Sequence, residues 1–113
     1  MSEFEIPAGL LARCAGQAEV CKRVISKYVE QMRLDVDEIS TMLESDAEAV
    51  AKIAHRMKGA SANVGAEDIR NKAEQIEKLA SEKDLGAVRP IALDLEKHWN
   101  EYESLTAEFL SFA

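Results

Sequence analysis

The sequence has 113 residues, of which 47% are hydrophobic, and its formal net charge is −7. This length fits one domain with a small core, and a count of only 5 glycines and 2 prolines excludes a disordered or collagen-like chain. An acidic chain without a basic cluster is poorly suited to nucleic acid, and no apolar run approaches the roughly 20 residues of a membrane span. We therefore expect a single domain over residues 1–113 that binds neither nucleic acid nor membrane.

The N-terminal segment and the cysteines indicate the cellular compartment. Residues 1–14 (MSEFEIPAGLLARC) begin with acidic residues and lack the long apolar core of a signal peptide. Cys14 and Cys21 are too few for a disulfide framework, and the sequence has no CxxC motif and no histidine–cysteine cluster at metal-ligand spacing. We expect two reduced, buried thiols in a cytoplasmic protein without a metal site.

Apolar periodicity predicts helices from the N-terminus onward and no strand. Pro7 opens a short first helix, which extends to about residue 15, and a long helix follows over roughly residues 18–44. The apolar residues of this long helix recur every three or four positions and form one buried stripe: Val20, Val24, Ile25, Tyr28, Met32, Val36, Ile39 and Leu43. Ser45 is the expected N-cap of the third helix, with Glu48 completing a capping box.

The second half of the chain continues with helices of the same kind. The third helix is expected to end near Asn63, with Gly65 in the left-handed conformation just past its end. The fourth helix is expected to bury Ile69, Ala73, Ile76, Leu79 and Ala80. The last helix is expected to bury Val88, Ile91, Leu95, Trp99, Tyr102, Leu105 and Phe109. Its start has two candidates, because either Asp84 is the N-cap or Pro90 lies in the first turn.

The connections between these helices are short, which favours antiparallel neighbours. No repeat, low-complexity tract or linker divides the chain. The sequence therefore predicts an all-α fold, namely an antiparallel up-down-up-down four-helix bundle with a short extra N-terminal helix.

His55 is expected to lie on the outer face of the third helix. When residues are placed at intervals of about 100°, the apolar stripe falls on the opposite side. That stripe consists of Val50, Ile53, Met57, Ala60 and Val64. The neighbours of the histidine on its own face are small (Ala51, Gly59 and Ala62), and Lys52 and Lys58 flank them at about 60°.

Gly59 is the residue of this helix that most needs an explanation, because a glycine inside a helix costs about 1 kcal/mol relative to alanine. It lies away from the apolar stripe, so helix packing does not require it. It leaves the surface around His55 bare, and a second macromolecule can therefore approach the imidazole closely. A neutral imidazole is a nucleophile near pH 7, and the Lys58 ammonium group favours an anion attached to it. The pattern predicts a histidine that receives a phosphoryl group from one protein and passes it to another.

The other histidine and the aromatic residues of the last helix are interpreted as structural. His98 has Leu95 and Tyr102 as its helix neighbours and no cleared surface around it, so we place it at the edge of the bundle. The aromatic residues are spaced like the rest of their apolar stripe, which is typical of a core rather than of a cofactor site.

The residues around His55 resemble a known signature. Residues 55–59 (HRMKG), followed by residues 61–66 (SANVGA), are similar to the H-x-L-K-G-x-x-x-x-x-G signature of histidine phosphotransfer (HPt) domains. Met57 stands where leucine is commonest, a volume-conserving change on the buried face. The similarity covers nearly the whole chain through an aromatic residue in the long helix, an acidic turn and a pair in the fourth helix: Tyr28, Ser45-Asp46 and Ile76-Glu77.

The resemblance implies roles for individual residues. His55 would be the phosphorylated residue, Lys58 would steady the phosphoryl oxygens, and Gly59 would keep the approach open. Glu77 falls where the family often has a polar side chain hydrogen-bonded to the imidazole, which would leave the other ring nitrogen free to attack.

The resemblance also implies a phosphorelay intermediate, a phosphocarrier without kinase activity of its own. A hybrid sensor histidine kinase would load it through a receiver domain, and the receiver domain of a response regulator would unload it. The chain has no Walker, kinase or glycine-rich phosphate motif. We expect a monomer with no cofactor of its own, and with Mg²⁺ on the partner receiver domain. The expected docking surface consists of Ala51, Lys52, Lys58, Gly59 and Ala62.

Two alternative functions stay open at this stage. A helical phosphocarrier of a sugar-transport system would also carry a phosphohistidine. A helical interaction module of another class would bind a partner without phosphate chemistry. The pairing of Lys58 with Gly59 argues against pure docking, which needs neither residue.

Overall fold

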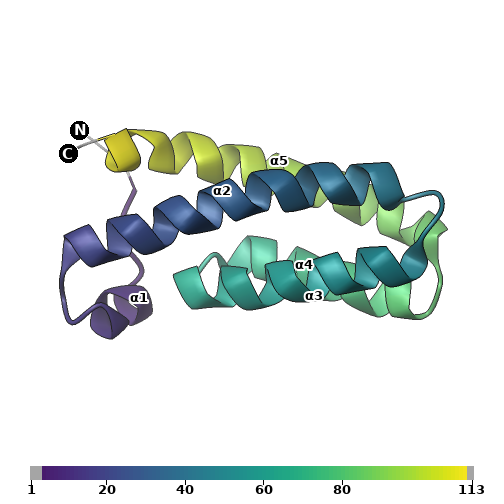
Figure 1. Cartoon of the computed structure of the whole chain (residues 1–113), viewed down its shortest axis with the longest axis horizontal. Coiled ribbons are helices and arrows are strands. Elements are labelled where there is room, and N and C mark those ends of the chain that lie inside the picture. Colours follow the sequence, from purple (N-terminus) through teal and green to yellow (C-terminus); the bar gives the residue numbers. More distant parts are fainter. Residues whose placement is uncertain (1–3, 112–113) are drawn as a thin grey trace.

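Five helices account for most of the computed structural model, which describes residues 4–111 (Figure 1). They are α1 (Ala8–Arg13), α2 (Ala18–Met42), α3 (Ala47–Val64), α4 (Glu67–Ser81) and α5 (Leu85–Ser111). No strand is present among residues 4–111, which confirms the predicted all-helical fold. Within that same range, no helix has both the length and the apolar character needed to cross a membrane.

Each long helix packs against two others. α2 contacts α3 and α5, and α4 likewise contacts α3 and α5. In Figure 1 the four long helices run along the 42 Å axis of the molecule, and α1 lies below the N-terminal end of α2. The helix that carries His55 is therefore flanked by α2 on one side and by α4 on the other.

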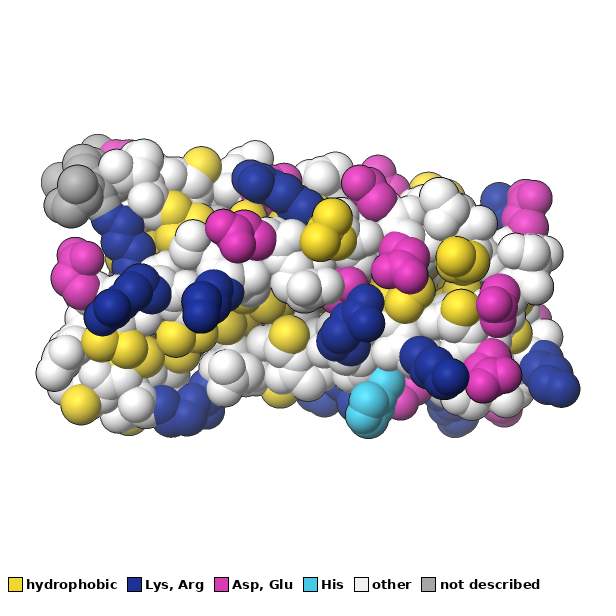
Figure 2. All heavy atoms as spheres, in the orientation of Figure 1, with side chains coloured by type: hydrophobic (Ala, Val, Ile, Leu, Met, Phe, Trp, Pro, Cys, Tyr) yellow, Lys and Arg dark blue, Asp and Glu magenta, His cyan; other side chains and the backbone are white. Residues whose placement is uncertain are grey.

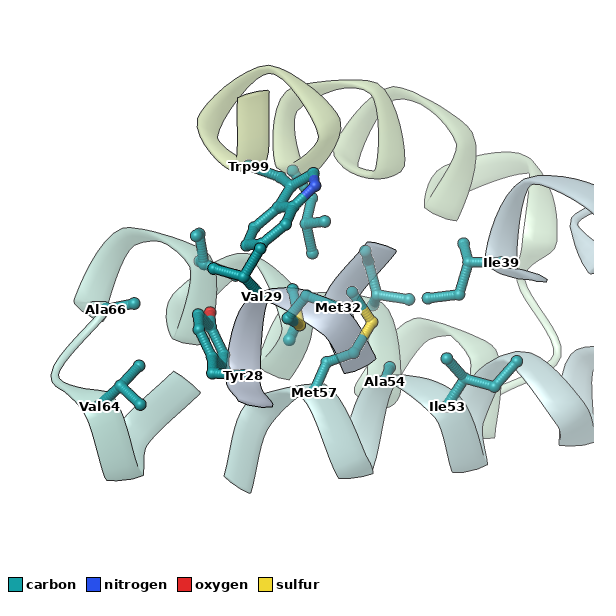
Figure 3. Packing of buried hydrophobic residues seen from close by; sticks show 14 of the residues in the cluster. Tyr28, Val29, Met32, Ile39, Ile53, Ala54, Met57, Val64, Ala66 and Trp99 are labelled. Atoms are coloured by element: carbon teal, nitrogen blue, oxygen red, sulfur yellow. The ribbon is translucent and has the colours of Figure 1, made fainter. Parts of the chain in front are cut away.

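Apolar side chains from the helices meet in one core. Met32 of α2 and Met57 of α3 have no exposed surface, and Figure 3 shows both side chains pointing into the space between the helices. Trp99 of α5 stacks on Tyr102 and meets Tyr28 edge-on, with 5.9 Å between ring centroids in both pairs. Burial of these side chains is the main contribution that holds the four long helices together.

The predicted stripe of α5 is wrong at one position. Leu105 is 44% exposed, whereas the next residue, Thr106, is fully buried. Thr106 follows the buried Trp99 by seven residues, which is two helical turns, so this position returns to the core side. Its hydroxyl donates to the carbonyl oxygen of Tyr102 at 2.9 Å, and this hydrogen bond satisfies the polar group inside the helix.

Cys14 and Cys21 are free and buried, as predicted. Cys21 has no exposed surface, and burial raises the pKa of its thiol to about 11. A thiol with this pKa stays protonated and unreactive near neutral pH. The cysteines therefore serve as small core residues where α1 meets α2.

Asp46, and not Ser45, caps the N-terminus of α3. The Asp46 carboxylate accepts a hydrogen bond from the backbone N–H of Ala49 at 3.0 Å, which is the usual contact of an N-cap side chain. The predicted capping box of Ser45 and Glu48 is wrong, because the helix begins at Ala47, one residue later than that box requires. The aspartate also places a negative charge at the positive end of the helix dipole.

The other two predicted helix boundaries have clear outcomes. Gly65 ends α3 with φ of +76°, in the left-handed region, as predicted. A Cβ atom at Gly65 would also lie 2.8 Å from the Cβ atom of Pro7, so the close approach of the N-terminal segment requires a glycine as well. Asp84 caps α5 by accepting from the N–H of Ala87 at 3.2 Å, and Pro90 lies inside that helix rather than in its first turn.

Replacing Asp46 with alanine is expected to lower the free energy of unfolding by about 1 kcal/mol, because α3 loses its N-terminal cap. Urea denaturation followed by circular dichroism measures this change. Ser45→Ala is the matched control and should stay within about 0.5 kcal/mol of wild type. An equal loss of stability in both variants would contradict the assignment of the cap to Asp46.

Candidate functional site

His55 lies on the outer face of α3, away from the core. Its side chain is 70% exposed, whereas Met57, two residues further along, has no exposed surface. The buried residues of the helix form one stripe: Val50, Ile53, Ala54, Met57, Ser61 and Val64. The imidazole therefore projects into solvent from the side opposite this stripe, where helix periodicity places it.

Glu77 of α4 contacts the imidazole of His55. Its Oε2 atom lies 2.6 Å from Nδ1 of the ring. An ionised carboxylate can only accept hydrogen bonds, so the Nδ1–H group of the histidine donates. The proton is thereby held on Nδ1, and a neutral ring keeps its lone pair on Nε2. The close packing of α3 against α4 makes this contact possible.

Lys58 binds the other oxygen of the same carboxylate. Its Nζ atom lies 2.6 Å from Oε1 of Glu77, and the two side chains are 29% and 24% exposed. The hydrogen bond from Lys58, followed by that from His55, holds the pKa of the Glu77 carboxyl below its usual range. Glu77 therefore stays ionised at neutral pH. From α4 it binds both the ammonium group of Lys58 and the imidazole of His55 on α3.

The surface around His55 is bare. A Cβ atom added at Gly59 would meet no atom within 4 Å, so no neighbour in the described chain requires a glycine there. Ala62 is exposed and Ala51 is half-buried, and both side chains end at Cβ. Lys52 is exposed and pairs at 3.3 Å with the glutamate one turn earlier. Figure 2 shows a histidine side chain that stands out from the surface next to basic and acidic side chains.

A buried carboxylate beside the site was missed by the sequence analysis. Asp35 of α2 is 1% exposed, and Arg56, the residue after His55, binds it through two nitrogens. The Nη2–Oδ1 distance is 2.5 Å and the Nε–Oδ2 distance is 3.3 Å. Gln31 donates to Oδ1 of the same carboxylate at 3.0 Å. A buried carboxylate is tolerated only when it is paired with an opposite charge and hydrogen-bonded. The ion pair between Asp35 and Arg56 therefore links α2 to α3 beside His55.

The sequence contained a signal for this pair. Asp35 follows Met32 by three residues and precedes Ile39 by four, which places a charged residue on the buried stripe of α2. A charge at such a position requires a partner of opposite sign. Helix periodicity does not identify the partner, because Arg56 lies on another helix.

His98 belongs to a different part of the molecule. It is half-buried and lines a cavity of about 400 Å³ between the N-terminal segment, the α3–α4 turn and α5. Across residues 4–111, no group of three or more histidine, cysteine, aspartate or glutamate residues is arranged to hold a metal ion.

The site thus presents an exposed imidazole whose Nδ1 is hydrogen-bonded to Glu77, with the Lys58 ammonium group nearby. The helix surface around the imidazole carries only small side chains at Gly59 and Ala62. A comparison with protein-family models matches residues 23–108 to the model described as the Hpt domain. The chain belongs to the Hpt domain family. The match includes all of α3 and α4, so His55, Lys58 and Glu77 lie inside it. Comparisons with curated proteins and with solved structures gave no significant match.

Membership of the Hpt family confirms the resemblance inferred from residues 55–66. It assigns the chain in general terms to histidine phosphotransfer in a phosphorelay. Hpt domains interact with the receiver domains of kinases and response regulators, and this is the class of partner that the family implies.

The ionised state of Glu77 has a consequence for stability. Its folded pKa lies below the unfolded value of about 4.3, so at this residue the unfolded chain binds more protons than the folded chain as the pH falls. The stabilising contribution is complete above the unfolded pKa and is lost as the pH falls through the folded pKa. Glu77→Gln is therefore expected to lower the free energy of unfolding by about 1 kcal/mol near pH 7, and by much less near pH 3.

Urea denaturation at the two pH values measures this difference. Glu74→Gln is the matched control, because Glu74 lies on the same helix with its side chain 56% exposed. It should change the free energy of unfolding by less than about 0.5 kcal/mol at either pH. A Glu77→Gln effect of the same size at both pH values would contradict the ionised bridge.

Proposed function

We propose that this Hpt domain is a phosphorelay intermediate whose His55 accepts a phosphoryl group from a phospho-aspartate and passes it to another aspartate. The donor is the receiver domain of a hybrid sensor histidine kinase, and the acceptor is the receiver domain of a response regulator. The observation that carries the proposal is the exposed imidazole whose Nδ1–H donates to Glu77. This contact leaves the lone pair of Nε2 available on an open surface.

The transfer exchanges one bond to phosphorus for another. Nε2 of the neutral His55 ring attacks the phosphorus of the acyl phosphate, and the P–O bond to the aspartate breaks as its electron pair leaves on the carboxylate. The phosphorylated ring keeps its proton on Nδ1 and is positively charged, and the Glu77 carboxylate stabilises that charge. Attack by the second aspartate on phosphorus returns the ring to its neutral form.

Lys58 supplies positive charge for the phosphoryl group. Its ammonium group binds Glu77 in the resting chain and lies one helical turn from His55. An ammonium group has three N–H donors, so Lys58 can keep its contact with Glu77 while another donor binds a phosphoryl oxygen. The carboxylate therefore orients both the nucleophile and the cation.

The receiver domain docks on the small residues and the lysine around the histidine. These are Ala51, Lys52, Gly59 and Ala62. Phosphoryl transfer relies mainly on positioning and on charge, so an open surface at the nucleophile serves it well.

We assign the whole chain, residues 1–113, to this one domain. The short turns between successive long helices support an antiparallel up-down-up-down arrangement of α2, α3, α4 and α5, with α1 as an extra helix. In this proposal the chain is a cytoplasmic monomer without kinase activity or a cofactor of its own. The Mg²⁺ that the reaction requires is bound by the receiver domain.

His55→Gln is expected to abolish transfer from a phosphorylated receiver domain while leaving the fold intact, because the side chain lies off the core. Transfer of labelled phosphate, and the acid-labile, base-stable character of the label on the wild-type chain, measure the first point. Thermal unfolding measures the second. Residual transfer by the variant, or a clearly lowered melting temperature, would count against this role of His55.

Gly59→Gln is expected to reduce the rate of transfer from a receiver domain by about tenfold or more, because a long side chain would occupy the docking surface. Loading by phosphoramidate, a small phosphoryl donor, should stay near the wild-type rate. Gly9→Gln is the matched control, since a Cβ atom at that helical glycine also meets nothing within 4 Å. Transfer from the receiver domain at the native rate in Gly59→Gln would remove the reason given for this glycine.

A further inference from the structure

The cavity that His98 lines lies at the end of the molecule where α3 turns into α4. It has a volume of about 400 Å³ and is formed by the N-terminal segment, the start of α4 and α5. Gly65, in its wall, follows His55 by ten residues, which is about 15 Å along the helix axis. The cavity is therefore separate from the candidate site, and its volume is within the range of sites that bind small molecules.

The inner walls of this cavity are apolar and partly aromatic. Ile69 is 2% exposed, and Ala66 is buried at the N-terminal end of the same helix. The rings of Phe4 and Tyr102 meet edge-on with 6.1 Å between their centroids, and both residues line the cavity. Aromatic rings pack against other rings and also attract cations. These walls therefore favour a ligand with an aromatic body.

One polar group of these walls lacks a partner. The hydroxyl oxygen of Tyr102 is buried, and it has no hydrogen-bond partner among residues 4–111. Burial raises the pKa of this phenol, so the hydroxyl stays protonated and is able both to donate and to accept. An unpaired buried hydroxyl is uncommon in proteins, and a polar group of a bound molecule can supply the missing hydrogen bond.

The rim of the cavity is acidic. Four residues with exposed carboxylates line it, namely Glu5, Glu67, Asp68 and Glu101. Glu67 pairs with Arg70 at 3.2 Å, whereas the other three have no ion pair within the described part of the chain. The positive end of the α4 dipole amounts to about half an elementary charge, so the carboxylates outweigh it. The rim therefore carries unpaired negative charge.

The charge of the rim and the apolar walls together select the class of ligand. An anion would meet carboxylates of the same sign. A metal ion needs converging ligands, and no group of three or more suitable side chains between residues 4 and 111 is arranged to hold one. An ammonium group at the rim would bind the carboxylates, while an aromatic body attached to it would fill the interior.

We infer that this cavity binds a small organic ammonium ion with an aromatic body. The ring of the ligand packs against Phe4, Ile69 and Tyr102, and its ammonium group pairs with Asp68 and Glu101. This binding function is additional to the proposed phosphotransfer and does not depend on it, because neither His55 nor the residues that contact it line the cavity.

Phenethylamine, which is protonated at neutral pH, is the probe for this inference. It is titrated into the full chain, and binding is followed through the NMR chemical shifts of the backbone amides. Ethylamine carries the charge without the ring, and phenylpropionate carries the ring with the opposite charge. We expect saturable shifts at Gly65, Ala66 and Ile69 with phenethylamine, and binding of both control compounds at least about tenfold weaker.

Glu101→Gln tests the contribution of the rim. Glu96→Gln is the matched control, because it removes the same charge from an exposed residue of α5 that does not line the cavity. Glu101→Gln should raise the Kd for phenethylamine about threefold, and Glu96→Gln should match wild type. Shifts that do not saturate, equal binding of either control compound, or the same Kd in both variants would overturn the inference.

Discussion

A single carboxylate from α4 connects the imidazole and the ammonium group of the candidate site on α3. Glu77 receives the Nδ1–H of His55 on one oxygen and the ammonium group of Lys58 on the other. The residue before it, Ile76, is fully buried, so the packing that fixes Ile76 in the core also fixes where the carboxylate stands. The tautomer of the histidine, the position of the lysine and the ionised state of the glutamate therefore all depend on how α4 packs against α3.

Much of the fold could be predicted because apolar spacing within one helix determines which side of that helix is buried. The stripe of α3 predicted that His55 would be exposed, and its side chain is 70% exposed. The two errors have different causes. Ser45 and Asp46 are both good N-caps, so the sequence does not decide between them. Thr106, and not Leu105, lies two helical turns after Trp99 on the core side, and a hydrogen bond to its own helix satisfies its hydroxyl there.

The apolar spacing predicted only the part of the candidate site that lies on a single helix, α3. His55, Lys58 and Gly59 lie within two turns of α3, so their spacing relates them directly, and Glu77 was added through the family resemblance. The pairing of Asp35 with Arg56 depends on how α2 is rotated about its axis relative to α3. The apolar spacing within one helix gives no information about this rotation.

The bare surface around His55 admits water as readily as it admits a protein. Gly59 and Ala62 carry no long side chain, so solvent reaches the imidazole directly from their side of the helix. An enzyme with a closing lid protects its intermediate but needs a motion before each exchange. In this domain the His55 side chain is 70% exposed, so a partner reaches the imidazole without a prior motion of the chain.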